Sequence, residues 1–290
     1  MMDPAGIVAL INDRHGTHFR LGRPMGGGES GCTHSILDDQ GIELILKWGE
    51  GSEFRVRPTL EITRRLRALA YPAPEFILAS SGNEVRYLVQ RMLPGRPGAA
   101  LTPALLERVV ELNRLQDEAA SDFVEGWPAR IVESVEKGFE DWCVHDSLAT
   151  HSRQTAALLG EVRRVVAGVA GAHFRTADAV HFDFSTANLL VEHGEVSGVI
   201  DWNGCCAGDR AFDLTTLAFY ALEEPDVATW LLDRAREISS APAIALYLAH
   251  LIVRQLDWSI RNHDQPTVTR YLNISRSALR VIRELPDGSR

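Results

Sequence analysis

The segment from residue 181 to residue 201 constrains this chain more than any other part of it. Its sequence is HFDFSTANLLVEHGEVSGVID. Two runs of β-forming residues, 189–191 and 196–200, flank a polar turn with a glycine at residues 192–195, and this pattern predicts a β-hairpin. Asn188 and Asp201 then lie at its open end, because opposed residues of an antiparallel pair have Cα atoms about 4.5–5.5 Å apart.

An amide oxygen and a carboxylate held side by side can share one hard cation. Magnesium prefers such oxygen ligands and usually takes one or two from the protein, with substrate phosphates filling further positions. Asp183 lies five residues before Asn188 in a short loop, which makes it a candidate base that need not bind the metal. Protein kinases use this order of residues. The alternative is that Asp183 caps a turn and that Asn188 only begins a strand.

Three blocks of the sequence carry a resemblance to a known family. They are residues 181–188, residues 198–202 (GVIDW) and residues 208–214 (GDRAFDL). Together they resemble the aminoglycoside phosphotransferase family, which is similar to choline kinases and distantly to protein kinases. The family commonly has His-Gly-Asp in the first block and Gly-Asp-Pro in the third, so this chain departs from it at Phe182 and Arg210. Neither departure removes a charged or metal-binding group, although Phe182 is expected to alter the acceptor side of the site.

The resemblance implies a kinase that uses ATP and magnesium, and it assigns roles to six residues. Asp183 accepts the proton of an acceptor hydroxyl, Asn188 and Asp201 bind Mg2+, and His181, Asp209 and Asp213 support the loop that carries Asp183. For the last two acids an alternative compatible with that support is that they cap and begin the following helix.

Candidate phosphate contacts come earlier in the chain. A glycine cluster at residues 26–31 lies between the first two predicted strands, and its backbone around Gly27, Gly28 and Ser30 can donate amide hydrogens to phosphate oxygens. The cluster lacks the Gly-Lys-Ser/Thr ending of a Walker loop, so a flexible hairpin is the competing interpretation.

A lysine and a glutamate complete the predicted nucleotide site. Lys47 ends an apolar β-run, very few other lysines occur in the chain, and Glu61 lies on the following predicted helix. By the kinase order, Glu61 pairs with Lys47 and orients it toward the α- and β-phosphates. The alternative for Lys47 is a charge that protects a strand end, and the alternative for Glu61 is an acid in the first helical turn that the helix dipole favours.

The segment at residues 89–95 resembles the hinge of the family, whose backbone binds the adenine edge. By that resemblance the Gln90 carbonyl and the Met92 amide make the contact. The modest size of Val89, at the position that sets pocket depth, leaves GTP as a second phosphate donor.

Composition narrows the class of protein. With 290 residues, 45 % hydrophobic and 24 % charged, the chain suits one large or two coupled domains. Its apolar runs are too short to span a bilayer, and its N-terminus lacks a secretory pattern, so a cytoplasmic protein with no membrane partner is expected. The four cysteines have neither zinc-like spacing nor the density of a disulfide framework, and they are expected to be reduced.

Charge is distributed unevenly along the chain. Residues 1–92 hold 11 basic and 11 acidic side chains, whereas residues 93–290 hold 19 and 28, so the net charge of −9 falls in the second part. This excludes a nucleic-acid partner, which needs a basic footprint. An acidic lobe favours a cationic substrate, although it also serves solubility alone. The candidate substrate contacts are Glu223, Glu224 and Asp257, for which a solvated helix face is the simpler explanation.

The pattern of elements predicts an α+β, bilobal, protein-kinase-like fold. Residues 1–92 are expected to form a nucleotide-binding lobe, a small antiparallel sheet with one main helix at 59–69. The Pro- and Gly-rich run at 93–98 is the expected boundary. Residues 93–290 are expected to form a mostly helical lobe with the catalytic loop, the acceptor site and long helices at 213–238, 243–262 and 267–284. Ligands are expected in the cleft between the lobes. The sequence does not distinguish a monomer from a homodimer.

The function expected from the resemblance is phosphorylation of a hydroxyl on a cationic antibiotic, conferring resistance. Similar enzymes act on aminoglycosides and on tuberactinomycin peptides such as viomycin and capreomycin. One alternative is a metabolic kinase whose acceptor is choline, a sugar or an amino alcohol. A second is a non-catalytic, nucleotide-binding scaffold, which would be expected to lack at least one of Lys47, Asp183, Asn188 or Asp201, and all four are present.

Overall fold

A computed structural model describes the chain except for residues 1–2, 26–32, 50–54, 81–84, 170–171 and 286–290. The polypeptide forms two compact units. The first unit consists of Met1–Arg108 and Thr186–Cys205, and the second consists of Val109–Ser185 and Cys206–Arg290. Residues 93–108 and 186–205 thus group with the first unit by their contacts, and the predicted division after residue 92 stays a prediction. None of the described helices is both long enough and apolar enough to cross a membrane.

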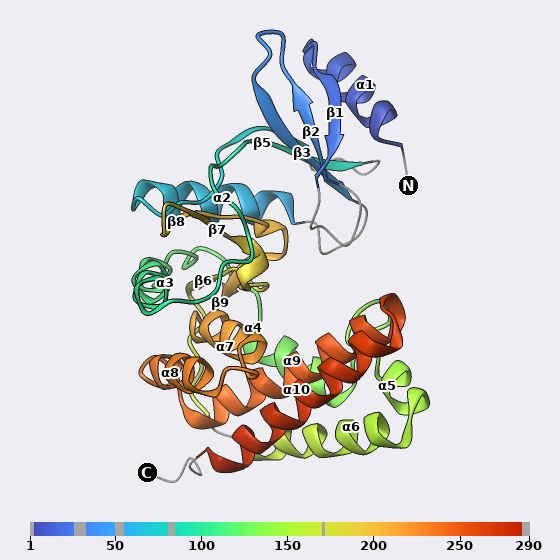
Figure 1. Cartoon of the computed structure of the whole chain (residues 1–290), viewed down its shortest axis with the longest axis vertical. Helices are drawn as coiled ribbons and strands as arrows, with labels where there is room; N and C mark the ends of the chain where they lie inside the picture. Colours follow the sequence, from blue (N-terminus) through green and yellow to red (C-terminus); the bar gives the residue numbers. More distant parts are fainter. Residues whose placement is uncertain (1–2, 26–32, 50–54, 81–84, 170–171, 286–290) are drawn as a thin grey trace. The chain divides into compact units, whose positions relative to one another are not determined.

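A five-stranded antiparallel sheet forms the centre of the first unit, with strand order β1-β2-β3-β5-β4 (Figure 1). The strands are β1 (Arg20–Pro24), β2 (Thr33–Leu37), β3 (Glu43–Gly49), β4 (Phe76–Ser80) and β5 (Arg86–Arg91). Strand β3 is buried along most of its length because it lies between β2 and β5. This sheet confirms the small antiparallel sheet that the sequence predicted for residues 1–92.

Two helices belong to this sheet-rich unit. Helix α1 (Pro4–His15) begins at Asp3, whose side chain caps it, and buries its apolar face against the sheet. Helix α2 (Val56–Ala68) buries one face through residues that include Ile62 and Leu66. The hairpin of β7 (Leu189–Glu192) and β8 (Glu195–Val199) also belongs to this unit.

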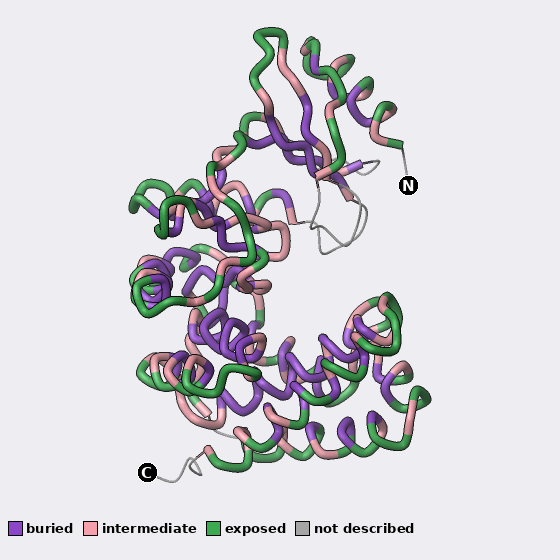
Figure 2. The backbone as a smooth tube through the Cα atoms, in the orientation of Figure 1, coloured by how far each residue is buried: buried purple, intermediate pink, exposed green. Residues whose placement is uncertain are grey.

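The second unit is mostly helical. Its helices are α4 (Trp127–Glu136), α5 (His145–His151), α6 (Arg153–Val165), α7 (Ala211–Tyr220), α8 (Pro225–Arg236), α9 (Ala241–Asn262) and α10 (Gln265–Glu284). Helix α3 (Pro103–Leu115) contains the change from one unit to the other at residue 108. Helix α9 is buried along most of its length (Figure 2), because helices α4, α5, α6, α7 and α10 all contact it.

A short antiparallel pair leads into the predicted catalytic loop of this helical unit. Strand β6 (Asp178–Val180) pairs with β9 (Cys206–Gly208). The loop at residues 181–185 follows β6, and α7 starts three residues after β9. The β6–β9 pair therefore brings the loop next to the start of α7.

Helices fill most of the predicted range 213–238, and the structure divides them into two. Helix α7 ends at Tyr220 and α8 begins at Pro225, which occupies its first turn. Proline has no N–H for the helical ladder and fits at a helix start but not in the interior.

Candidate active site

The hairpin predicted from the sequence is present and places Asn188 and Asp201 at its open end. Leu189 pairs with Val199, and the Ile200 N–H donates to the Asn188 carbonyl at 2.9 Å. The turn consists of His193 and Gly194, both with positive φ (52° and 83°), as tight hairpin turns require.

Lys47 lies on β3 with only 8 % of its surface exposed, and it contacts Asp201. Its Nζ is 2.8 Å from Asp201 Oδ1. Asp201 has a φ of 68°, a left-handed conformation that Asp tolerates better than most residues. The buried ammonium therefore belongs to the same cluster as the carboxylate predicted to bind metal.

The expected pair of Lys47 with Glu61 is replaced by two other pairs. Lys47 pairs with Asp201, and Glu61 accepts from Arg57 Nε at 2.9 Å, one turn earlier on α2. The physical reason is that Ile62 and Leu66 take the buried face of α2, whereas Glu61 lies half-buried beside Arg57. A role for Glu61 at the nucleotide stays a prediction.

The start of α2 is tied to the chain that follows Asp201. The Arg55 N–H donates to the Asn203 carbonyl at 3.1 Å, and Arg55 Nη1 donates to the Cys205 carbonyl at 3.1 Å. Thr59, fully buried, places its hydroxyl 3.1 Å from the Trp202 carbonyl. These contacts hold the backbone around Asp201 in place, and no sequence motif indicated them.

The chemistry of this cluster suits a magnesium–triphosphate ligand. Asn188 offers an amide oxygen, Asp201 a carboxylate and Lys47 an ammonium, which are the groups that hard cations and phosphates prefer. Asn188 is 8 % exposed, so little side-chain movement is available to it. The described residues of the first unit thus fit the predicted cofactors.

In the second unit, Asp213 holds the backbone of the catalytic loop. Its Oδ2 accepts from the His181 N–H at 2.8 Å and from Gln116 Nε2 at 2.6 Å, and its Oδ1 accepts from the Phe182 N–H at 3.1 Å. Asp213 is fully buried, and burial raises its pKa to about 7 against the opposing effect of these donors.

His181 is also fully buried and contacts its own loop. Its Nδ1 lies 3.3 Å from the Asp183 N–H, and its ring meets the Phe184 ring edge-on at 5.8 Å between centroids. With its Nδ1 facing an N–H donor, the imidazole acts as an acceptor there. This geometry suits the bracing role expected for His181.

Asp183 is half-buried and pairs with an arginine of α9. Arg254 Nη2 is 2.9 Å from Asp183 Oδ1, and Arg254 Nη1 donates to the Phe182 carbonyl at 2.7 Å. One guanidinium therefore contacts both the loop backbone and the candidate base. Sequence reasoning missed Arg254, because a lone arginine inside a helical pattern gives no local signal.

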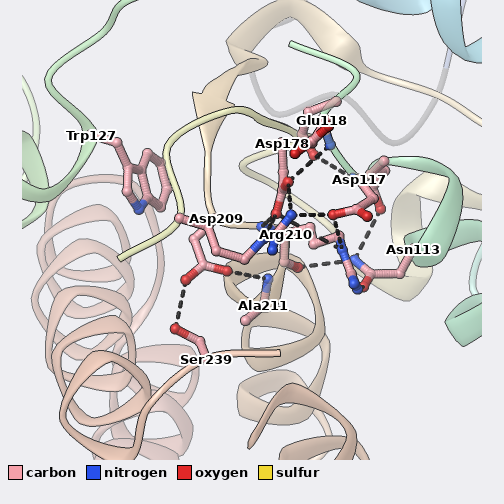
Figure 3. Close-up of polar contacts among 12 residues, drawn as sticks. Asn113, Asp117, Glu118, Trp127, Asp178, Asp209, Arg210, Ala211 and Ser239 are labelled. Atoms are coloured by element: carbon pink, nitrogen blue, oxygen red, sulfur yellow. Dashed lines mark hydrogen bonds and ion pairs between the residues drawn. The ribbon is translucent and has the colours of Figure 1, made fainter. Parts of the chain in front are cut away.

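Asp209 accepts hydrogen bonds at the start of α7 and from two hydroxyl groups, and its support of the loop at residues 181–185 stays a prediction. Its Oδ1 accepts from the Ala211 N–H at 2.9 Å, and its Oδ2 accepts from Ser239 Oγ and Tyr247 Oη at 2.6 Å and 2.9 Å. Burial raises the pKa of Asp209. Figure 3 shows the contacts to Ala211 and Ser239.

Arg210, where the related family commonly has proline, joins a second network in Figure 3. Its backbone N–H donates to Asp178 Oδ2 at 3.2 Å, a bond that proline cannot make, and its Nη1 donates to Asn113 Oδ1 at 3.1 Å. Burial alone would raise the pKa of Asp178, but hydrogen bonds from Arg175 and two backbone N–H groups outweigh it and lower that pKa. The substitution therefore anchors the chain just before α7 to β6.

The three acids predicted to contact a substrate differ in their surroundings. Asp257 is 1 % exposed and pairs with Arg261 at 2.8 Å, and Glu223 accepts from Arg270 at 2.6 Å. Glu224 is exposed next to the start of α8. Because two of the acids already hold a guanidinium, their substrate role stays a prediction.

The remaining predicted nucleotide contacts are in part outside the described residues. Gly27, Gly28 and Ser30 fall within the undescribed range 26–32. Gln90 is buried in β5, and Met92 follows the end of that strand with 36 % exposure. Their hinge role stays a prediction.

A five-stranded antiparallel sheet with α2, followed by a mostly helical second unit, is the kinase-like α+β fold that the sequence predicted. The model of the phosphotransferase enzyme family matches residues 22–247. The chain therefore belongs to this family, and it is a phosphotransferase that uses a hydroxyl group as acceptor. No curated protein was found to match the chain in sequence.

Solved structures with the same fold include several kinases of small molecules. Aminoglycoside phosphotransferase APH(4)-Ia, as a thermostable mutant with ADP and hygromycin B, is 16 % identical with a TM-score of 0.70, covering 94 % of this chain and 97 % of that one. Choline kinase LicA from Streptococcus pneumoniae is 14 % identical with a TM-score of 0.67, over 95 % and 98 %. Amicoumacin kinase hAmiN, in complex with AMP-PNP, Ca2+ and Ami, is 14 % identical with a TM-score of 0.63, over 99 % and 96 %. At these identities the likeness shows the fold.

Proposed function

We propose that this protein transfers the γ-phosphate of ATP to a hydroxyl group of a small molecule in the presence of Mg2+. The observation that carries this proposal is the cluster of Lys47, Asp201 and Asn188 at the hairpin of the first unit. Bound magnesium would neutralise phosphate charge, and Asn188 and Asp201 are the residues that would hold it. The ammonium of Lys47 would orient the triphosphate.

Asp183 is proposed to accept the proton of the acceptor hydroxyl. The hydroxyl oxygen forms a bond to the γ-phosphorus, the bond from that phosphorus to the β–γ bridging oxygen breaks, and ADP leaves. In such reactions the protein contributes mainly position and charge. Asp213 supports this role by fixing the loop backbone before Asp183, and Arg254 by holding its carboxylate.

Two acceptor classes deserve direct comparison. The net negative charge of residues 93–290 supports a cationic antibiotic, and enzymes with this fold were solved with hygromycin B and with amicoumacin. A metabolic alcohol is the second class, since a choline kinase shares the fold. A non-catalytic scaffold is disfavoured because all four predicted catalytic and metal-binding side chains are retained.

The test is release of ADP from ATP with a panel of acceptors, with and without Mg2+, together with mass spectrometry for the gain of one phosphate. Turnover is expected only with Mg2+ and an acceptor, and Asp183→Asn is expected to lower it at least about a hundredfold. Asp226→Asn, an exposed acid at the start of α8, is the matched control. Nucleotide binding without turnover on any acceptor, unchanged by Asp183→Asn, would support the scaffold instead.

A further inference from the structure

Partly exposed rings and guanidinium groups lie around Phe182 within the second unit. They are Phe139, Trp142, Phe182, Arg130 and Arg254, all of them half-buried, and we call this set the Phe182 surface. Asp183 directly follows Phe182 in the loop and pairs with Arg254. An acceptor that presents a hydroxyl to Asp183 therefore comes next to a member of this surface.

The Phe182 ring is fixed in place at a backbone cost. Its φ is 75°, a conformation that glycine adopts freely and that is a genuine outlier for a bulky residue. The ring stacks on buried Phe212 at 5.3 Å with an interplanar angle of 14°, and the edge of Trp142 meets it at 6.0 Å. These contacts retain the strained backbone and hold the ring beside the candidate base.

Two guanidinium groups lie over this ring. The Arg254 carbon Cζ is 5.1 Å from the centre of Phe182, and that of Arg130 is 5.9 Å from it. Arg130 also lies 5.3 Å from the centre of the Trp142 ring, and Phe139 stacks on that ring at 4.7 Å between centroids. Aromatic rings therefore position both arginines.

The two arginines differ in how their N–H groups are used. Arg254 donates to Asp183 and to the Phe182 carbonyl. The contacts of the Arg130 side chain are with two aromatic rings, and among the described residues no carboxylate pairs with it. Ring contacts engage the face of a guanidinium and leave its N–H fork for a planar anion such as a carboxylate.

Buried His250 contributes no charge to this surface. The Ser134 hydroxyl donates to the Ile131 carbonyl at 2.6 Å, so it accepts from Nδ1–H of His250 at 2.7 Å. Burial, with Arg254 and Arg130 nearby, lowers the pKa of His250 well below its usual value. With a neutral imidazole, the partly exposed charges at the Phe182 surface are two guanidinium groups and the carboxylate of Asp183, while the fully buried Asp213 lies behind the loop backbone.

We propose that Arg130 is a specificity-determining residue that binds a carboxylate, or an equivalent planar anion, of the acceptor. The acceptor is then a hydroxylated acid whose hydroxyl faces Asp183 while its anionic group pairs with the guanidinium fork of Arg130. This inference rests on the proposed function. It differs from an acceptor chosen by net charge, because two guanidinium groups lie near the Phe182 ring next to Asp183 although residues 93–290 as a whole are acidic.

Binding of three matched probes tests the proposal without relying on turnover. Hydroxymethylbenzoate, its amide and the corresponding benzylamine share one alcohol and differ in charge, and their dissociation constants follow from ligand-observed NMR titration of the full chain. The carboxylate is expected to bind about tenfold tighter than the amide, and the amine most weakly. Arg130→Gln is expected to remove the preference for the carboxylate, while Arg280→Gln, an exposed arginine of α10, leaves it unchanged.

Arg130→Lys keeps the charge but loses the fork, so it is expected to retain part of the preference and covers the case in which Arg130→Gln fails to fold. The proposal is overturned if the amine binds as well as the acid, if none of the probes binds, or if folded Arg130 variants keep the full preference. Failure of the proposed function has another signature. No acceptor would then stimulate ADP release, even though the carboxylate still binds through Arg130.

Discussion

Replacing Asp213 by asparagine tests how the catalytic loop is held. The change keeps the volume and removes the charge. Asparagine has one acceptor oxygen, so it can retain the bonds from His181 and Gln116 to Oδ2 and must then turn its NH2 toward the Phe182 N–H. Above pH 7, where Asp213 is ionised, one hydrogen bond is lost and a buried donor faces another donor, which costs about 1–3 kcal/mol of unfolding free energy.

The pH dependence of this effect has a defined sign. Burial raises the folded-state pKa of Asp213 to about 7 from 3.8. Between these values the folded state holds a proton that the unfolded state has released, so the stability contributed by Asp213 is fully present below about pH 4 and is lost as pH rises through 7. The largest change in unfolding free energy that this pKa shift can produce is about 4 kcal/mol. Asparagine does not titrate, so the variant should lack this component of the pH slope.

Urea unfolding followed by tryptophan fluorescence at several pH values between 4.5 and 8 measures both effects. The gap in stability between wild type and Asp213→Asn is expected to narrow as pH rises, and kcat is expected to fall because the loop before Asp183 loses a support. Asp226→Asn, an exposed substitution of the same kind, should change neither. Parallel pH profiles for wild type and Asp213→Asn would refute the reasoning about burial.

Two further changes test packing and the nucleotide site. Gly208→Ala would bring a Cβ within 2.5 Å of the buried Trp127 ring, so urea unfolding is expected to show a loss of about 1–3 kcal/mol in unfolding free energy. Gly160→Ala, which meets open space in helix α6, should instead raise the unfolding free energy by about 0.5–1 kcal/mol. Equal effects of the two variants would contradict the packing argument. Lys47→Met should lower kcat/KM for ATP by at least about a hundredfold. Substitution of the exposed Lys137 by methionine should leave kcat/KM unchanged. Comparable kinetics for the two variants would show that Lys47 does not belong to the nucleotide site.

Contacts between segments far apart in the chain limited what could be predicted about the site. The hairpin after Asn188 was predictable because turn residues and β-formers act over about a dozen neighbouring positions. The partner of Lys47 was predicted as Glu61 from the kinase order, yet Asp201 takes that place in the structure. The pairing depends on how β3, α2 and the hairpin pack, and the hydrophobic periodicity of the sequence does not predict it.

Local sequence patterns predicted the order of the chemical groups, the hairpin, the small sheet and the long helices, because hydrophobic period, glycine and proline act locally. Which groups meet depends on how these elements pack. Arg254 reaches Asp183 from 71 residues away, and the guanidinium of Arg130 is held by rings from two other segments. A side chain finds such partners only after the helices have packed, since burial and direction are properties of the assembled unit and not of the residue alone.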